Sequence, residues 1–163
     1  MRKLSDFTVI FLFILSALLT TSAFAADKAP WGVATNGHYD YKPQKVVYDV
    51  NLRTEKAVSG VLDRASFLSK ITGADPFESS IVLVLHGAEI PFFAIKNYDK
   101  YKDLMHRVQS LVESDVLKIK MCQLAAQGQG FSPAQIHGFV QMVPMGDAEI
   151  IRLQNEEQHA YMQ

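Results

Sequence analysis

The stretch Ile81-Val82-Leu83-Val84-Leu85-His86-Gly87 decides the fold predicted for this chain of 163 residues. Its first five residues are β-branched or leucine, without a polar interruption, which is typical of a strand buried on both faces of a parallel sheet. We therefore expect residues 81–85 to form the centre of the sheet. His86 and Gly87 then fall in the loop beyond its carboxyl end.

Strand and helix patterns alternate on both sides of this stretch. The predicted strands lie at residues 46–52, 81–85, 116–121, 140–143 and 160–162. The predicted helices begin at Thr54, near residues 97–99, at the sequence Ser132-Pro133 and at Asp147. This alternation predicts an α/β protein, a three-layer α/β/α fold with a mostly parallel sheet of four to five strands.

The first 25 residues have the pattern of an export signal. Arg2 and Lys3 supply positive charge, residues 7–19 form an apolar run, and Ala23-Phe24-Ala25 is a small-x-small cleavage pattern. The apolar run is shorter than the roughly 20 residues that span a bilayer, so we predict cleavage after Ala25 and a periplasmic protein without membrane contact. An extracellular location, or a membrane tether formed by an uncleaved signal, are the alternatives.

The rest of the chain divides into an irregular N-terminal arm, residues 26–44, and an α/β domain, residues 45–163. The arm combines prolines and glycines with aromatic residues and shows neither a strand nor a helix period. Its aromatic side chains either hold it to the domain or to a neighbouring subunit, or the arm is a mobile tether. The formal net charge of the whole chain is −1 and no basic stripe occurs, so nucleic acid is not an expected partner.

Cys122 is the only cysteine of the chain. In an oxidising compartment such a thiol is buried and inert, bridged to another molecule, or kept for sulfur chemistry. Cys122 follows the third predicted strand, and the strand period places it on the same face as Lys118 and Lys120. Residues 123–128 are helix formers ended by a glycine, so the sulfur is expected at a helix N-terminus, where backbone N–H groups stabilise a thiolate or persulfide anion.

Reactive groups of open parallel sheets gather at the carboxyl ends of the strands. If the second and third predicted strands are neighbours, His86 lies close to Cys122, where a neutral imidazole can accept the thiol proton and an imidazolium can hold the thiolate. The alternative is a histidine satisfied by loop backbone. Glu89 and His137 are interpreted as solvated or capping groups. Glycine-rich phosphate loops, serine-hydrolase elbows and zinc-protease helices do not occur in the sequence, which argues against nucleotide binding and ordinary hydrolysis.

Methionine is one of the side chains that bind copper in proteins. Soft ligand types are present in Met121, Met142, Met145, Cys122 and His86. Met121 is expected on the opposite strand face from Cys122, and no Cys-x-x-Cys or Met-x-x-Met pair supports a site. We therefore expect the methionines to pack in the core, and we predict no metal and no other cofactor.

Several motifs of residues 45–163 occur in a characteristic order. After the stretch 81–87 come a long amphipathic helix, the strand ending in Cys122 with Ala125 and Gly128 behind it, Phe131-Ser132-Pro133 and Val143-Pro144-Met145-Gly146. In this order they resemble the DsrE/DsrF-like family, in an exported form. The resemblance implies a five-stranded, mostly parallel sheet, assembly into trimers or hexamers and, as in some members, a cysteine that carries sulfur as a persulfide.

In the resemblance, Cys122 occupies the position of the sulfur acceptor. His86 is the candidate thiol activator, and Gly87, Gln123 and Gly128 are the candidate ligand-binding residues. The resulting hypothesis is an exported homo-oligomer that acts as a sulfur carrier or sulfurtransferase-type relay with donor and acceptor proteins or small sulfur species. The alternative is a non-catalytic oligomeric module that binds a small ligand or serves as a scaffold.

Overall fold

The computed structural model describes residues 31–163, and the predicted signal peptide lies outside this range. Residues 31–38 belong to a separate unit and contain no helix or strand. Residues 39–163 form the α/β unit that carries all the regular structure. No helix within residues 31–163 is both long enough and apolar enough to cross a membrane.

Five strands and four α-helices make up the α/β unit. The strands are β1 (Lys45–Val50), β2 (Ser80–Leu85), β3 (Lys118–Cys122), β4 (Val140–Val143) and β5 (Ala160–Met162). The α-helices are α2 (Glu55–Ile71), α3 (Lys102–Glu113), α4 (Gln123–Gly128) and α5 (Gly146–Glu157). Short 3-10 helices occupy Ile90–Phe93, Ile95–Lys100 and Pro133–Gln135.

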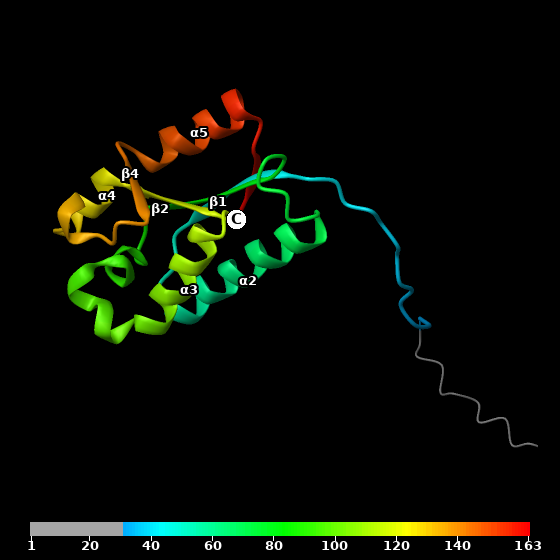
Figure 1. Ribbon diagram of the computed structural model, residues 1–163, viewed down its shortest axis with the longest axis horizontal. Helices are drawn as coiled ribbons and strands as arrows, with labels where there is room; N and C mark the ends of the chain where they lie inside the picture. Colours follow the sequence, from blue (N-terminus) through cyan, green and yellow to red (C-terminus); the bar gives the residue numbers. More distant parts are fainter. Residues whose placement is uncertain (1–30) are drawn as a thin grey trace, which may run out of the picture. The chain divides into compact units, whose positions relative to one another are not determined.

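The strands form one parallel sheet in the order β4-β3-β2-β1-β5. As predicted from its unbroken apolar run, β2 is the central strand, and its residues 81–85 are all buried. Helices α2 and α3 lie against one face of the sheet and α5 against the other (Figure 1). The structure therefore confirms the predicted three-layer α/β/α fold.

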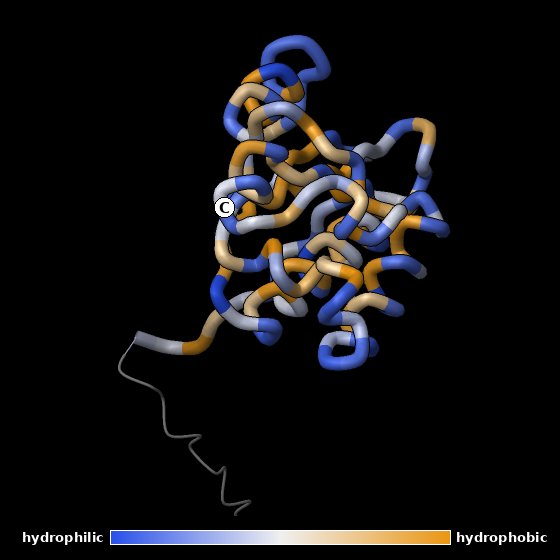
Figure 2. The backbone as a smooth tube through the Cα atoms, turned by 90° about the vertical axis from the view of Figure 1, so that its left-hand side faces the viewer, coloured by the Kyte–Doolittle hydropathy of each residue, from blue (hydrophilic) through white to orange (hydrophobic). Residues whose placement is uncertain are grey.

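The two faces of the sheet bury unequal cores. The face under α2 and α3 carries the large cluster, in which Tyr48, Leu83 and Met121 are fully buried. The face under α5 has a small apolar cluster, in which Val47, Val82 and Val84 of the sheet pack with Ile150 and Leu153 of α5. Figure 2 shows hydrophobic residues toward the inside of the unit and hydrophilic residues on its outer loops. Because a single helix covers the α5 face, this face keeps room for polar residues beside its small core.

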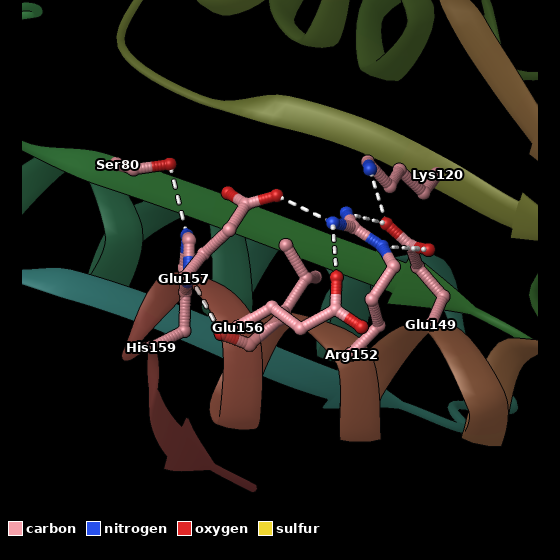
Figure 3. Close-up of polar contacts among 8 residues, drawn as sticks. Ser80, Lys120, Glu149, Arg152, Glu156, Glu157 and His159 are labelled. Atoms are coloured by element: carbon pink, nitrogen blue, oxygen red, sulfur yellow. Dashed lines mark hydrogen bonds and ion pairs between the residues drawn. The ribbon is translucent and has the colours of Figure 1, made fainter.

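Polar residues on the α5 face form the network of Figure 3. Lys120, which the strand period places on the same face as Cys122, is buried and donates to Glu149 of α5. Arg152 adds two hydrogen bonds to the same carboxylate, at 2.7 and 2.9 Å. The strand pattern predicted the face of Lys120 correctly but not its burial, because only the packing of α5 across the sheet removes it from water.

Two predicted helices differ from the structure, one in length and one in its start. The Ser132-Pro133 signal produces a capping box but only one 3-10 turn, because the chain becomes extended at Ile136 and pairs there with Ala94. Helix α3, which was predicted to begin near residues 97–99, begins at Lys102, because a 3-10 helix occupies Ile95–Lys100. The predicted N-cap of α2 is present, with Oγ1 of Thr54 accepting from the Ala57 N–H at 3.2 Å.

Candidate functional site

Cys122 is the last residue of β3 and the N-cap of α4. Its Sγ accepts a hydrogen bond from the backbone N–H of Ala125 at 3.4 Å. A thiolate accepts such a bond better than a thiol does, because the negative charge faces an N–H dipole. The predicted position of the sulfur at a helix start is therefore present in the structure.

Cys122 is one of the residues that line a hollow, which we call the thiol cavity. This cavity has a volume of about 320 Å³, and its lining residues are His86, Cys122, Leu124, Ala125, Met145, Gly146 and Asp147. The cysteine itself is only 6% exposed, although it lines this cavity. A cavity of this size is at the lower end of the range found for small-molecule sites.

His86 and Cys122 line the same cavity because β2 and β3 are neighbours and both strands end at this edge. A β-carbon built on Gly146 would lie 3.1 Å from Cβ of His86 and 3.3 Å from Cβ of Cys122. The two side chains thus flank the first residue of α5. No hydrogen bond joins the imidazole to the sulfur within residues 31–163, so the pair is adjacent but not bonded.

A carboxylate that the sequence reasoning missed holds the histidine. Nε2 of His86 lies 2.5 Å from Oδ1 of Asp49 in β1, and each side chain is 22% exposed. The second oxygen of Asp49 accepts a hydrogen bond from the Tyr161 hydroxyl of β5 at 2.6 Å. Burial acts to raise the pKa of Asp49, but the hydrogen bonds from His86 and Tyr161 and the attraction to His86 outweigh it, so its pKa lies below the ordinary value.

The predicted ligand-binding residues do not line the thiol cavity. Gln123 and Gly128 are the first and last residues of α4. Gly87 instead permits a close backbone approach, because a β-carbon there would lie 2.7 Å from Cα of Asn51. The carbonyl of Gly87 accepts a hydrogen bond from Nε2 of Gln129 at 2.8 Å. These residues shape the loops around the cavity.

Glu89 was interpreted as a solvated or capping group, and the structure shows it fully buried. Its two oxygens accept from the backbone N–H groups of Leu52 at 2.7 Å and Gly87 at 2.8 Å. The carboxylate therefore ties the loop after β2 to the loop after β1. It lies below the site and supports the backbone that carries His86.

A second hollow, of about 390 Å³, lies beside α3 and is larger than the thiol cavity. His137 lines it, stacked on Phe139 with ring centroids 5.5 Å apart and next to Tyr98. Burial lowers the pKa of His137, and its Nε2 has no hydrogen-bond partner within residues 31–163. Because neither a cysteine nor a serine lines this hollow, we assign the candidate site to the smaller cavity that contains the thiol.

The methionine, cysteine and histidine side chains considered as copper ligands lie on both faces of the sheet. Met121 lies in the large core, on the opposite side of the sheet from Cys122, as the strand period predicted. Met145 does line the thiol cavity. In the part of the chain that the structure describes, no three His, Cys, Asp or Glu side chains gather as a metal site would require.

Comparisons with known proteins support the fold alone. No protein-family model matches the chain, and no curated protein matches it. Among solved structures, a protein of unknown function from Methanobacterium thermoautotrophicum is similar with a TM-score of 0.58 and 20% sequence identity. The similarity covers 76% of this chain and 98% of that protein. The α/β/α architecture is therefore shared with a known structure, while the function has to be argued from the site.

Proposed function

We propose that this protein is a sulfur carrier in which Cys122 accepts a sulfane sulfur and passes it on as a persulfide. The observation that carries the proposal is the position of Cys122, whose Sγ accepts a backbone N–H at the start of α4 and which lines the thiol cavity. A carrier needs one reactive thiol, and the chain has one cysteine. The resemblance of residues 45–163 to the DsrE/DsrF-like family supports the same function.

The proposed reaction conserves atoms and electrons without an external oxidant. The thiolate of Cys122 attacks the outer sulfur of thiosulfate or of a polysulfide, a new S–S bond forms, and the donor S–S bond breaks. Sulfite or the shortened polysulfide leaves with the electron pair. An acceptor thiolate then attacks the outer sulfur of the persulfide and releases the thiolate of Cys122.

Mass spectrometry of the intact protein tests this reaction. The purified protein is incubated under native conditions with thiosulfate or polysulfide and weighed beside a Cys122→Ser variant. We expect the native protein to gain the mass of one sulfur atom and the variant to gain nothing. If the mass of the native protein stays unchanged with both donors, the proposal is overturned.

A homo-oligomer, a trimer or a hexamer, forms part of the proposal. Large apolar side chains lie exposed around the thiol cavity and on α5, with Leu124 60% exposed, Met145 43% and Ile151 57%. Neighbouring exposed apolar side chains favour a protein interface. Light scattering on the purified protein tests this assembly. We expect the mass of a trimer or a hexamer, and a monomer over the accessible concentration range would contradict the proposed homo-oligomer.

The periplasmic location is likewise a proposal, based on the signal pattern of residues 1–25. Cell fractionation together with the mass of the secreted form tests it. We expect a periplasmic product that begins at Ala26. A protein that retains Met1 in the cytoplasm contradicts it.

The second candidate function is a non-catalytic module that binds a small ligand or acts as a scaffold. The observation that favours it is the low exposure of Cys122, because buried cysteines commonly pack as small hydrophobic residues. Alkylation separates the two candidates. A thiol that reacts with iodoacetamide only after unfolding favours the module.

A further inference from the structure

We propose that Asp49 and Tyr161 are positioning residues for Cys122, which hold His86 so that its Nδ1 is free to take the thiol proton. The inference rests on the proposed function, since it concerns the activation of the same thiol. It assigns a role to two residues on the strands that lie beyond β2 in the sheet, β1 and the C-terminal strand β5. Neither lines the thiol cavity.

The direction of the hydrogen bonds follows from the charge of Asp49. Its lowered pKa leaves the carboxylate ionised at neutral pH, and an ionised carboxylate only accepts hydrogen bonds. Nε2 of His86, 2.5 Å from Oδ1, must therefore carry the proton. In the neutral imidazole Nδ1 is then the nitrogen with the free lone pair.

Tyr161 fixes the carboxylate in turn. The hydroxyl donates to Oδ2 at 2.6 Å, so both oxygens of Asp49 are bonded and rotation of the carboxylate would break a hydrogen bond. The pKa of Tyr161 is raised, mainly because the hydrogen bond to Asp49 favours the protonated phenol. The two hydrogen bonds that join Tyr161 to Asp49 and Asp49 to His86 thus connect β5, β1 and the end of β2, which are neighbours in the sheet.

A base that is oriented by a third group and lies beside a nucleophile is the general arrangement for activating a thiol. Here His86 and Cys122 flank Gly146 and share the thiol cavity, although they are not hydrogen-bonded in the described chain. Such contacts are often long without substrate and shorten when it binds. Orientation of the ring is the part that Asp49 and Tyr161 can supply.

The test uses two readouts that do not depend on sulfur transfer. The first is the rate at which iodoacetamide alkylates Cys122 in the folded protein at neutral pH. The second is the tautomer of His86, read from the ¹⁵N shifts of its ring nitrogens and assigned with a His86→Gln variant. Sulfur uptake is measured in parallel by intact mass.

The variants are Asp49→Leu, Tyr161→Phe, His86→Gln and the double variant of His86 and Asp49. Tyr98→Phe is the matched control, because it also removes a hydroxyl bound to a histidine, His106 at 3.0 Å, but away from the thiol cavity. We expect alkylation to slow about tenfold in Asp49→Leu and less in Tyr161→Phe. The control should behave like the native protein.

The double variant distinguishes positioning from a structural effect. If Asp49 acts through His86, Asp49→Leu should slow alkylation no further once His86 is glutamine. In Asp49→Leu alone, His86 should no longer carry its proton exclusively on Nε2. Unchanged alkylation rates together with an unchanged tautomer in Asp49→Leu and Tyr161→Phe would overturn the inference.

The parallel sulfur measurement separates the two proposals. Slowed alkylation in the variants with no sulfur uptake by the native protein supports the positioning role and overturns the carrier. Sulfur uptake by the native protein, with alkylation rates and a His86 tautomer that are unchanged in Asp49→Leu and Tyr161→Phe, supports the carrier and overturns the positioning role.

Discussion

Gly146 and Cys122 are packed so closely that a β-carbon on the glycine would lie 3.3 Å from Cβ of the cysteine. The first residue of α5 thereby forms one wall of the thiol cavity. This contact links the helix that covers the smaller core to the only thiol of the chain.

Gly146→Ala should restrict access to Cys122. The added methyl group would also lie 3.1 Å from Cβ of His86, tighter than ordinary van der Waals contact, so it fills space between the two side chains. We expect alkylation of Cys122 to slow several-fold with little change of fold. Gly138→Ala is the control, because a β-carbon there meets nothing within 4 Å. Equal alkylation rates for the Gly146 variant and the native protein would contradict this geometry.

Acid should destabilise the contact between α5 and the sheet. Hydrogen bonds from Arg152, opposed by burial and assisted by Lys120, lower the pKa of Glu149 to about 2. The folded pKa is below the unfolded value, so this stabilisation is present at neutral pH and is lost as the pH falls from about 4.5 toward 2. Urea unfolding across this window should show a loss on the order of 2 kcal/mol.

Glu149→Gln should remove most of this acid dependence and lower stability at neutral pH, because it leaves the charge of buried Lys120 without its partner. Glu156→Gln is the matched control. Its carboxylate is 67% exposed and 3.8 Å from Arg152, where a surface ion pair contributes little. An acid transition that is the same in Glu149→Gln as in the native protein would refute the assignment.

Mild acid should loosen the C-terminal strand β5 first. His159 is buried and bonds the Ser80 hydroxyl at 3.0 Å and the Leu153 carbonyl at 3.2 Å (Figure 3). Burial lowers its pKa below the usual 6.5, with a smaller opposing effect from the Leu153 hydrogen bond. The unfolded strand therefore binds the proton more readily, and stability falls as the pH drops below about 6.5.

Hydrogen exchange of the amides of β5 measures this effect. We expect their protection to decrease between about pH 7 and 5, more than that of β2, and His159→Gln to show no such decrease. Exposed His38 offers the control variant His38→Gln, which should behave like the native protein. Protection of β5 that does not change over this range would contradict the role of His159.

Loss of the Glu89 carboxylate should destabilise the loops below the site. Glu89→Ala leaves two part-buried backbone N–H groups, those of Leu52 and Gly87, without an acceptor. We expect a loss of about 3 kcal/mol in the free energy of unfolding. Glu78→Gln, at an exposed position, should change it very little. A Glu89 variant as stable as the native protein would show that water or other groups satisfy these amides.

The sequence predicted the architecture well because the sheet has a simple local signal. The unbroken apolar run at residues 81–85 specified a central strand, and the strand period put Cys122 and Lys120 on one face and Met121 on the other. These features depend only on residue order along one strand. The signal peptide, the oligomer and the sulfur chemistry stay predictions.

The parts that sequence reasoning missed depend on contacts between distant strands. Asp49 interrupts an apolar strand, which is a signal that could have been noticed, but its pairing with His86 follows from the strand order. Tyr161 reaches Asp49 only because β5 returns to pair with β1. Burial of Lys120 and Glu89 required the positions of α5 and of the loop after β1. Side-chain partners across a sheet are set by topology, which no local pattern contains.

The mass of the folded protein after incubation with thiosulfate or polysulfide tests the central claim most directly, especially when an acceptor thiol is added afterwards. The account predicts that one sulfur atom is gained at Cys122 and that the acceptor restores the original mass. A native protein that keeps its mass throughout, while its unfolded form reacts readily with iodoacetamide, would contradict the claim.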